Sequence, residues 1–187
     1  MSEANWKLPL KWNALAIAET TRKRIFCASM ADVFENRTDL IKPRERLFEL
    51  IKQTPMLDWQ LLTKRPQNIE KLIPEFNLPN VWLGTSAEDQ ERWNERVSVL
   101  MSLPATIRFV SAEPLLGPID MNGIFPEWLI VGGESGHGAR PMEKSWVESL
   151  QKQSEGKTAF FFKQWGGVRK KQAGRELNGK IYGDFPA

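Results

Sequence analysis

The chain has 187 residues, of which 41% are hydrophobic and 26% are charged, a balance typical of a folded globular protein rather than a disordered one. A chain of this length buries roughly two thirds of the surface that its unfolded form exposes, so it can build a core without disulfides or a structural metal. The sequence has one cysteine, Cys27, and one histidine, His137. These counts exclude an internal disulfide, a structural zinc site with four thiolate or imidazole ligands, and a cluster held by three cysteines of this chain.

The net charge is only +3, a mild bias toward anionic partners and far from the basic stripe of a dedicated nucleic-acid binder. The first residues have no apolar core of the kind that a signal peptide requires. No apolar run approaches the roughly 20 residues needed to span a bilayer. We therefore expect a cytoplasmic protein that does not interact with a membrane.

A recurring pattern runs along the chain: a short β-branched or aromatic run, then polar, glycine or proline residues, then a helical stretch. Runs of five to seven residues have the length of strands and are too short for helices. The pattern predicts six strands, at residues 24–30, 59–63, 81–86, 107–111, 128–132 and 159–163.

Four helices are predicted between these strands, starting at Pro43, over 66–73, over 88–101, and over 145–153 with Gly156 closing the last. The link between the fourth and fifth strands differs from the others. It contains three prolines and two glycines within residues 114–126, which favours a loop.

Alternating strands and helices with nearly continuous apolar strands predict an α/β fold with a parallel sheet. Six strands can form an open doubly wound sheet or most of a (β/α) barrel. We favour a parallel (β/α) barrel or incomplete barrel, because no glycine-rich dinucleotide turn follows the first strand. Residues 1–187 are expected to form a single domain, with a basic tail from about residue 168 that is solvated or, as an alternative, contacts phosphate.

The carboxyl ends of parallel strands meet at one edge of the sheet, where active sites of α/β proteins lie. Every predicted strand ends in polar or charged residues, and glutamates follow three of them. A ring of such residues around the strand ends suits a pocket for a small polar ligand that carries both amino and carboxylate groups. The alternative is that these residues cap helices or lie in solvated loops. The strand-end candidates are Lys64, Arg65, Glu88, Ser111, Glu113, Glu134 and Lys163.

Residues 131–140 are rich in glycine, with four glycines at positions 132, 133, 136 and 138. Glycine there sacrifices backbone entropy, and the usual reason is that a ligand or another backbone approaches closely. Glu134 could accept hydrogen bonds from an ammonium group or hydroxyls while loop N–H groups hold a carboxylate or phosphate. A tight turn without any ligand is the alternative. The lysine and serine or threonine that end a Walker loop are absent.

Several other residues with reactive or charged side chains are explained at least as well by structural roles. His137 has no partner that spacing identifies and fits a surface loop better than a general base. Cys27 lies in an apolar strand, where a buried and inert thiol is expected, and Trp82 is expected in the core. Lys64 and Arg65 precede a helix-starting proline and could clamp an anion, or form a surface turn. No catalytic residue is assigned.

Six segments, in this order, together resemble one protein family: 26–34, 60–66, 80–86, 108–118, 131–136 and 161–166. It is the phage and prophage protein family of unknown function that carries an N-terminal three-cysteine motif and resembles radical SAM enzymes. The resemblance extends from about Trp6 to Phe185.

The resemblance implies that complete members hold an iron–sulfur cluster on three cysteines and bind S-adenosylmethionine. Cys27 matches none of the three, so the chain resembles an N-terminally truncated member that is not competent for cluster chemistry alone. By this analogy Gly132, Gly133 and Glu134 bind the cofactor, with Ser111 and Glu113 beside them. The anion or substrate residues are then Lys64, Arg65 and Lys163.

If a first strand is missing, the strand around Ile25 has an unpaired edge, which invites pairing. We therefore expect a homodimer or a separately encoded N-terminal segment as partner. Two alternative functions remain at this stage. The chain could be a nucleic-acid-associated accessory protein of phage origin that uses its basic tail and exposed tryptophans, with salt-sensitive binding, or an inactive prophage remnant.

Overall fold

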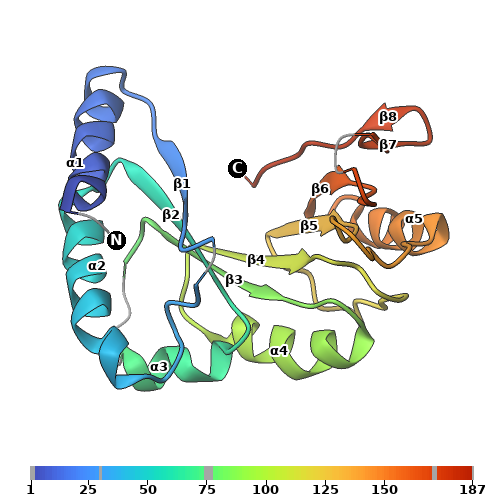
Figure 1. The fold of residues 1–187 in the computed structure, drawn as a ribbon, viewed down its shortest axis with the longest axis horizontal. Helices are drawn as coiled ribbons and strands as arrows, with labels where there is room; N and C mark the ends of the chain where they lie inside the picture. The colour runs from blue at the N-terminus through green and yellow to red at the C-terminus, as the bar shows by residue number, and fades with distance from the viewer. Residues whose placement is uncertain (1–2, 30, 74–77, 170–171, 187) are drawn as a thin grey trace. The chain divides into compact units, whose positions relative to one another are not determined.

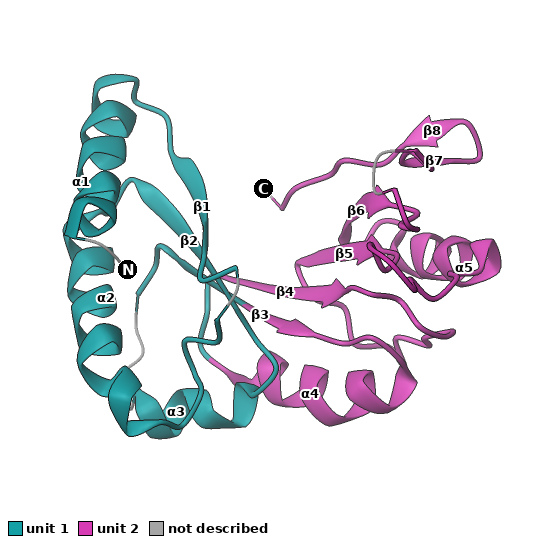
Figure 2. Ribbon diagram, in the orientation of Figure 1, with its two compact units in different colours: residues 1–83, 104–106 teal, residues 84–103, 107–187 magenta. Residues whose placement is uncertain are grey.

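A computed structural model describes residues 3–29, 31–73, 78–169 and 172–186, and Figure 1 follows them from the N-terminus in blue to the C-terminus in red. The chain divides into two compact units (Figure 2). Unit 1 comprises residues 1–83 and 104–106, and unit 2 comprises residues 84–103 and 107–187. The expectation of a single domain stays a prediction.

Six strands form one sheet in the order in which they occur along the chain. β1 pairs in parallel with β2, β4 with β5, and β5 with β6, so both strands of each of these pairs run in the same direction. A strand order without reversal is that of a (β/α) barrel and excludes the doubly wound alternative. The α/β class, the six strands and the barrel-type topology are therefore confirmed. The strands are β1 (Lys23–Cys27), β2 (Leu57–Thr63), β3 (Val81–Ser86), β4 (Ile107–Ala112), β5 (Trp128–Gly132) and β6 (Ala159–Gln164).

Unit 1 begins with a helix that the sequence pattern did not predict, α1 (Glu3–Ala18). Its buried face consists of Pro9, Asn13 and Ala16, which follow one another at helical spacing. Asn13 is polar, Ala16 is small, and Pro9 is of a residue type that is rare inside a helix, so the sequence shows no apolar stripe that would predict this helix. Asn13 fixes it to the sheet, since its side-chain oxygen accepts a hydrogen bond from the Met56 amide at 2.9 Å.

The second helix of unit 1, α2 (Ile41–Gln53), confirms the helix predicted around Pro43 and begins two residues earlier. Its apolar stripe packs into the core, where Ile51 is fully buried. The predicted helix over 66–73 is shorter, a 3-10 turn at Pro66–Asn68 followed by α3 (Ile69–Leu72).

Asn80 is a buried polar residue that holds three parts of unit 1 together. Its side-chain amide donates to the carbonyls of Ile51, Thr54 and Leu57 at 3.1–3.2 Å, and its own carbonyl accepts from the Trp59 amide. The side chain is only 5% exposed. It therefore ties the end of α2 to the start of β2, and adds a donor to the carbonyls of Ile51 and Thr54, which also accept from the amides of Thr54 and Leu57.

Unit 2 contains α4 (Gln90–Ser102) and α5 (Lys144–Ser154), close to the predicted helices. The prediction began α4 two residues too early, because the Asp89 side chain accepts a hydrogen bond from the Arg92 amide and so caps the helix. The stripe of Trp93, Val97 and Leu100 is fully buried, as expected. The link between β4 and β5 contains no helix or strand among its described residues, which confirms the predicted loop.

The C-terminal segment is mostly exposed over its described residues 172–186, and its role as a solvated tail or a phosphate contact stays a prediction. It forms a short hairpin of β7 (Glu176–Leu177) and β8 (Lys180–Ile181), and Leu177 is only 1% exposed. Arg175 donates to the Tyr182 carbonyl at 2.8 Å and lies over the Phe161 ring. Part of the basic charge thus serves packing, while Lys170 and Lys171 of the predicted basic cluster lie outside the described residues, as does Met30.

Two further expectations concern surfaces. In the sheet order β1 is a terminal strand, with β2 as its neighbour, so it has the edge that was predicted, and a partner for that edge stays a prediction. Within the described parts of the chain, no helix combines the length and apolar character needed to cross a membrane.

Replacing Asn80 by leucine should lower the free energy of unfolding by about 2–4 kcal/mol, because the buried hydrogen bonds from its side chain to three carbonyls are lost at once. Urea denaturation followed by circular dichroism measures this. Asn94→Ala is the matched control, since Asn94 is exposed on α4, and it should change the free energy by less than about 0.5 kcal/mol. Equal effects of the two substitutions would contradict the role given to Asn80.

Candidate functional site

An oppositely charged pair lies at the carboxyl ends of β4 and β6 in unit 2. The Lys163 ammonium is 3.1 Å from Glu113 Oε2 and 3.3 Å from Glu113 Oε1, and the Ser111 hydroxyl donates to the same carboxylate at 3.3 Å. The Lys163 side chain is 49% exposed and that of Glu113 only 16%. The carboxylate is therefore fixed in place, while the ammonium group can move aside.

Two glycines at the end of β5 lie close to other atoms of the chain. A Cβ at Gly132 would lie 2.7 Å from Glu113 Oε2, and one at Gly133 would collide with the backbone carbonyl of Trp165. Gly133 also donates its N–H to the Gln164 carbonyl at 3.0 Å. Of the two explanations offered by the sequence, a ligand or another backbone, the second accounts for Gly133. Gly132 makes room for the Glu113 side chain.

Glu134 is held by a cation of its own loop. Both carboxylate oxygens accept from the Arg140 guanidinium at 2.8 Å, and the Arg140 amide adds a third bond. These hydrogen bonds lower the pKa of Glu134 from its ordinary value to about 2. A ligand amine at Glu134 would have to replace three hydrogen bonds from Arg140, whereas one at Glu113 would displace the single ammonium group of Lys163.

Gln164 and Ser135 are two polar residues of this edge that were not among the sequence candidates. The Gln164 amide donates to the Ser135 hydroxyl at 2.6 Å and to the Gly133 carbonyl at 3.4 Å. Gln164 directly follows Lys163 at the end of β6, and that position was the only signal that could have found it. The pair ties the glycine-rich loop to β6.

Glu88, the third strand-end glutamate, has a structural role. Arg96 donates from the same nitrogen to Glu88 Oε2 at 3.2 Å and to the Ser86 carbonyl at 3.0 Å, and both side chains are nearly buried. The Glu88 carbonyl accepts from the Leu116 amide at 2.8 Å. These bonds fasten the end of β3 to α4 and to the loop after β4.

The predicted anion clamp of Lys64 and Arg65 lies in unit 1. There the Arg65 guanidinium is 3.0 Å from Asp32 Oδ2, and the same oxygen accepts from the Thr63 hydroxyl and the Lys64 amide. Asp32 thus organises this turn, and Arg65 already has an anion of its own. An external anion at these two residues stays a prediction.

The structure therefore brings together four of the eight predicted site residues, Ser111, Glu113, Gly132 and Lys163. Gly133 and Glu134 directly follow Gly132 in the chain. Lys64 and Arg65 belong to unit 1. Among the described residues, no group of three or more histidine, cysteine, aspartate or glutamate side chains is placed to hold a metal ion.

These features define a parallel α/β protein with a charged pair and a glycine-rich loop at its strand ends. A family profile described as "Protein of unknown function (DUF5131)" matches residues 1–186. The chain belongs to that family. No curated protein and no solved structure matched the chain.

Substituting Gly133 by alanine should lower the free energy of unfolding by about 1–3 kcal/mol, because the new methyl group meets the Trp165 backbone. Gly117→Ala is the matched control: its Cβ would have open space, and the free energy should stay within about 1 kcal/mol of the original value. Chemical denaturation of both variants measures the difference. If Gly133→Ala is as stable as Gly117→Ala, the close approach of the two backbones is wrong.

Proposed function

We propose that unit 2 binds a small polar molecule carrying both an amino and a carboxylate group, with S-adenosylmethionine as the first candidate. The juxtaposition of Glu113 and Lys163 at the carboxyl ends of β4 and β6, on either side of β5, carries this proposal. The ligand amine replaces the Lys163 ammonium on the Glu113 carboxylate, and the ligand carboxylate pairs with the displaced Lys163. Opposite charges at the carboxyl edge of a parallel sheet are well placed for such exchange.

The chemistry of the donor groups fits the amino-acid end of S-adenosylmethionine. Glu113 offers a carboxylate of which one oxygen also accepts from Ser111, and the half-exposed Lys163 offers a mobile cation. Gln164 and Ser135 supply further hydrogen-bonding groups in unit 2. When bound, this cofactor supplies an activated alkyl group on its sulfonium sulfur, while the residues named here bind and orient its polar end.

An iron–sulfur cluster does not fit the residues of this chain, because the sequence offers a single thiolate ligand, Cys27, and such clusters are held by several cysteines. The proposal includes a common ancestry with radical SAM-like phage and prophage proteins, supported by the six sequence segments and by the barrel-type strand order.

Isothermal titration calorimetry with S-adenosylmethionine tests the proposal. The unaltered chain should bind one molecule, and Glu113→Gln and Lys163→Met should each weaken binding by roughly 10- to 100-fold, since each removes a charge-assisted hydrogen bond. Lys152→Met is the matched control, because Lys152 is an exposed lysine on α5 away from the strand ends, and it should bind as tightly as the unaltered chain.

Three outcomes would contradict the proposal: no heat of binding with the unaltered chain, binding that Glu113→Gln leaves unchanged, or equal weakening by Lys152→Met. A nucleic-acid function is separated by salt. If the chain instead binds an oligonucleotide with an affinity that falls steeply between low and moderate salt, the accessory-protein alternative gains support at the expense of this one.

A further inference from the structure

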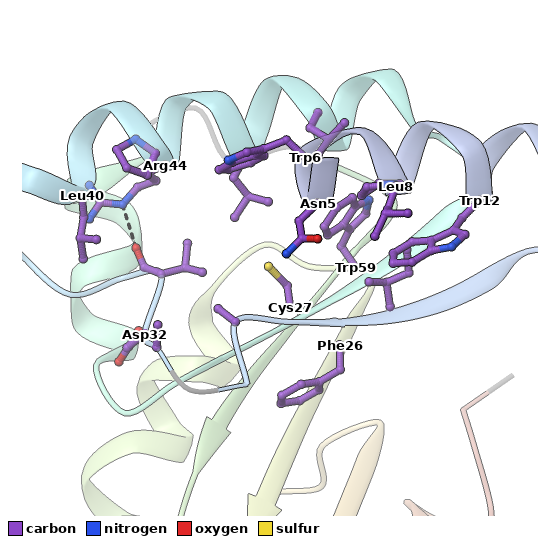
Figure 3. Close-up of a pocket in the computed structure, with 18 residues that line it drawn as sticks. Asn5, Trp6, Leu8, Trp12, Phe26, Cys27, Asp32, Leu40, Arg44 and Trp59 are labelled. Atoms are coloured by element: carbon purple, nitrogen blue, oxygen red, sulfur yellow. Dashed lines mark hydrogen bonds between the residues drawn. The ribbon is translucent and has the colours of Figure 1, made fainter. Parts of the chain in front are cut away.

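Unit 1 contains a cavity of about 750 Å³ that α1, β1, α2 and β2 line together (Figure 3). Small-molecule sites typically have volumes of roughly 300–1,000 Å³ and mostly apolar walls with a few polar groups. This cavity has that character, since most of its lining side chains are apolar and three of them are tryptophans, Trp6, Trp12 and Trp59. All of the described residues that line it belong to unit 1.

Two of the three tryptophans are already fixed in position by other residues. The Trp59 indole N–H donates to the Thr54 hydroxyl at 3.0 Å, and its side chain is only 3% exposed. The Arg46 guanidinium lies 4.6 Å from the centre of the Trp6 ring. Rigid aromatic walls bind flat rings with little loss of side-chain entropy.

Two charged side chains at one end of the cavity, Arg44 and Asp32, differ in their partners. Figure 3 shows Arg44 and Asp32 at that end, away from Leu8 and Trp12. The charge of Asp32 is balanced by Arg65 at 3.0 Å. Arg44 is only 8% exposed and donates to the carbonyls of Val33 and Glu35.

Among the carboxylates that the structure describes, none forms an ion pair with Arg44. A buried cation whose partners are only carbonyl oxygens is stabilised strongly when an anion joins it, because burial without a counter-charge is unfavourable. The lining therefore combines apolar aromatic walls with one positive charge that has no counter-ion, a combination that matches an aromatic anion.

We propose that this cavity binds an aromatic organic anion, with its rings against the apolar lining and its carboxylate or sulfonate group at Arg44. The proposal does not depend on the function proposed for unit 2, and each can fail without the other.

The probe for this site is 1-anilinonaphthalene-8-sulfonate, an aromatic sulfonate whose fluorescence rises in apolar surroundings. We expect saturable binding of one probe per chain. The neutral analogue N-phenyl-1-naphthylamine, which lacks the sulfonate, should bind about 10-fold more weakly or worse, because it cannot form a charge-assisted bond with Arg44.

Three variants localise the probe. Val33→Trp places a larger side chain in the lining and should reduce the binding of both molecules at least about 10-fold. Arg44→Gln should weaken the sulfonate and leave the neutral analogue unchanged. Leu10→Ser is the matched control, since Leu10 is an exposed apolar residue of α1 outside the lining, and both molecules should bind it as they bind the unaltered chain.

The rate of Cys27 alkylation in the unaltered chain provides a second readout. It can be measured even if Arg44→Gln does not fold. The chain has a single cysteine, and its sulfur lies within the cavity region of Figure 3. Burial raises the pKa of the Cys27 thiol to about 11, so iodoacetamide alkylates it slowly and a bound probe should slow the reaction further.

The result that supports the proposal is binding that protects Cys27, is lost in Val33→Trp and is kept in Leu10→Ser. Binding that all variants share, binding that leaves alkylation unchanged, or a preference for the neutral analogue would overturn it. Sedimentation adds one more outcome against it: a dimer in which Cys27 is protected without the probe would mean that a second copy of the chain covers the cavity.

Discussion

The site in unit 2 depends on the close approach of two backbone segments at the ends of β5 and β6. Gly133 meets the Trp165 carbonyl without room for a side chain, and a Cβ at Gly166 would in turn collide with the backbone of Glu134 and Gly133. Hydrogen bonds lock the two segments, from Gly133 to Gln164 and from Gly167 to Glu134. Because the backbones are this close, Lys163 on β6 comes within reach of Glu113 on the strand beyond β5.

The two units provide different chemistry. At the strand ends of unit 2 a nearly buried carboxylate faces a half-exposed ammonium group, an arrangement suited to a zwitterionic ligand. In unit 1 a cavity is lined mainly by aromatic and aliphatic side chains, with Arg44 as a buried cation. The first arrangement exchanges one ion pair for two, whereas the second gains from burying apolar area and from neutralising one charge.

Sequence patterns predicted the fold well where hydrophobic periodicity was strong. All six strands and the stripe of Trp93, Val97 and Leu100 were predicted, because their burial follows simple spacing. Helix α1 was missed, since its buried face is Pro9, Asn13 and Ala16 rather than an apolar stripe. The C-terminal hairpin was missed as well, because its two strands have only two residues each and are too short to show an alternating pattern.

The candidate site was predictable in its residue types but not in its pairings. Strand topology placed Glu113 and Lys163 at the same edge, which the structure bears out. That Glu134 is taken by Arg140 depends on how the glycine-rich loop folds back over six residues, and no periodicity encodes this. Asn80 likewise looks like an ordinary loop residue in the sequence, and only the structure shows that its buried side chain donates to three carbonyls.

The most direct test of the central claim is a map of amide chemical-shift changes by ¹H–¹⁵N NMR as S-adenosylmethionine is added to the isotope-labelled chain. The account predicts that the shifts concentrate at the ends of β4, β5 and β6, in residues 111–116, 132–135 and 163–167. Shifts confined to unit 1, or a spectrum that does not change at saturating ligand, would contradict it.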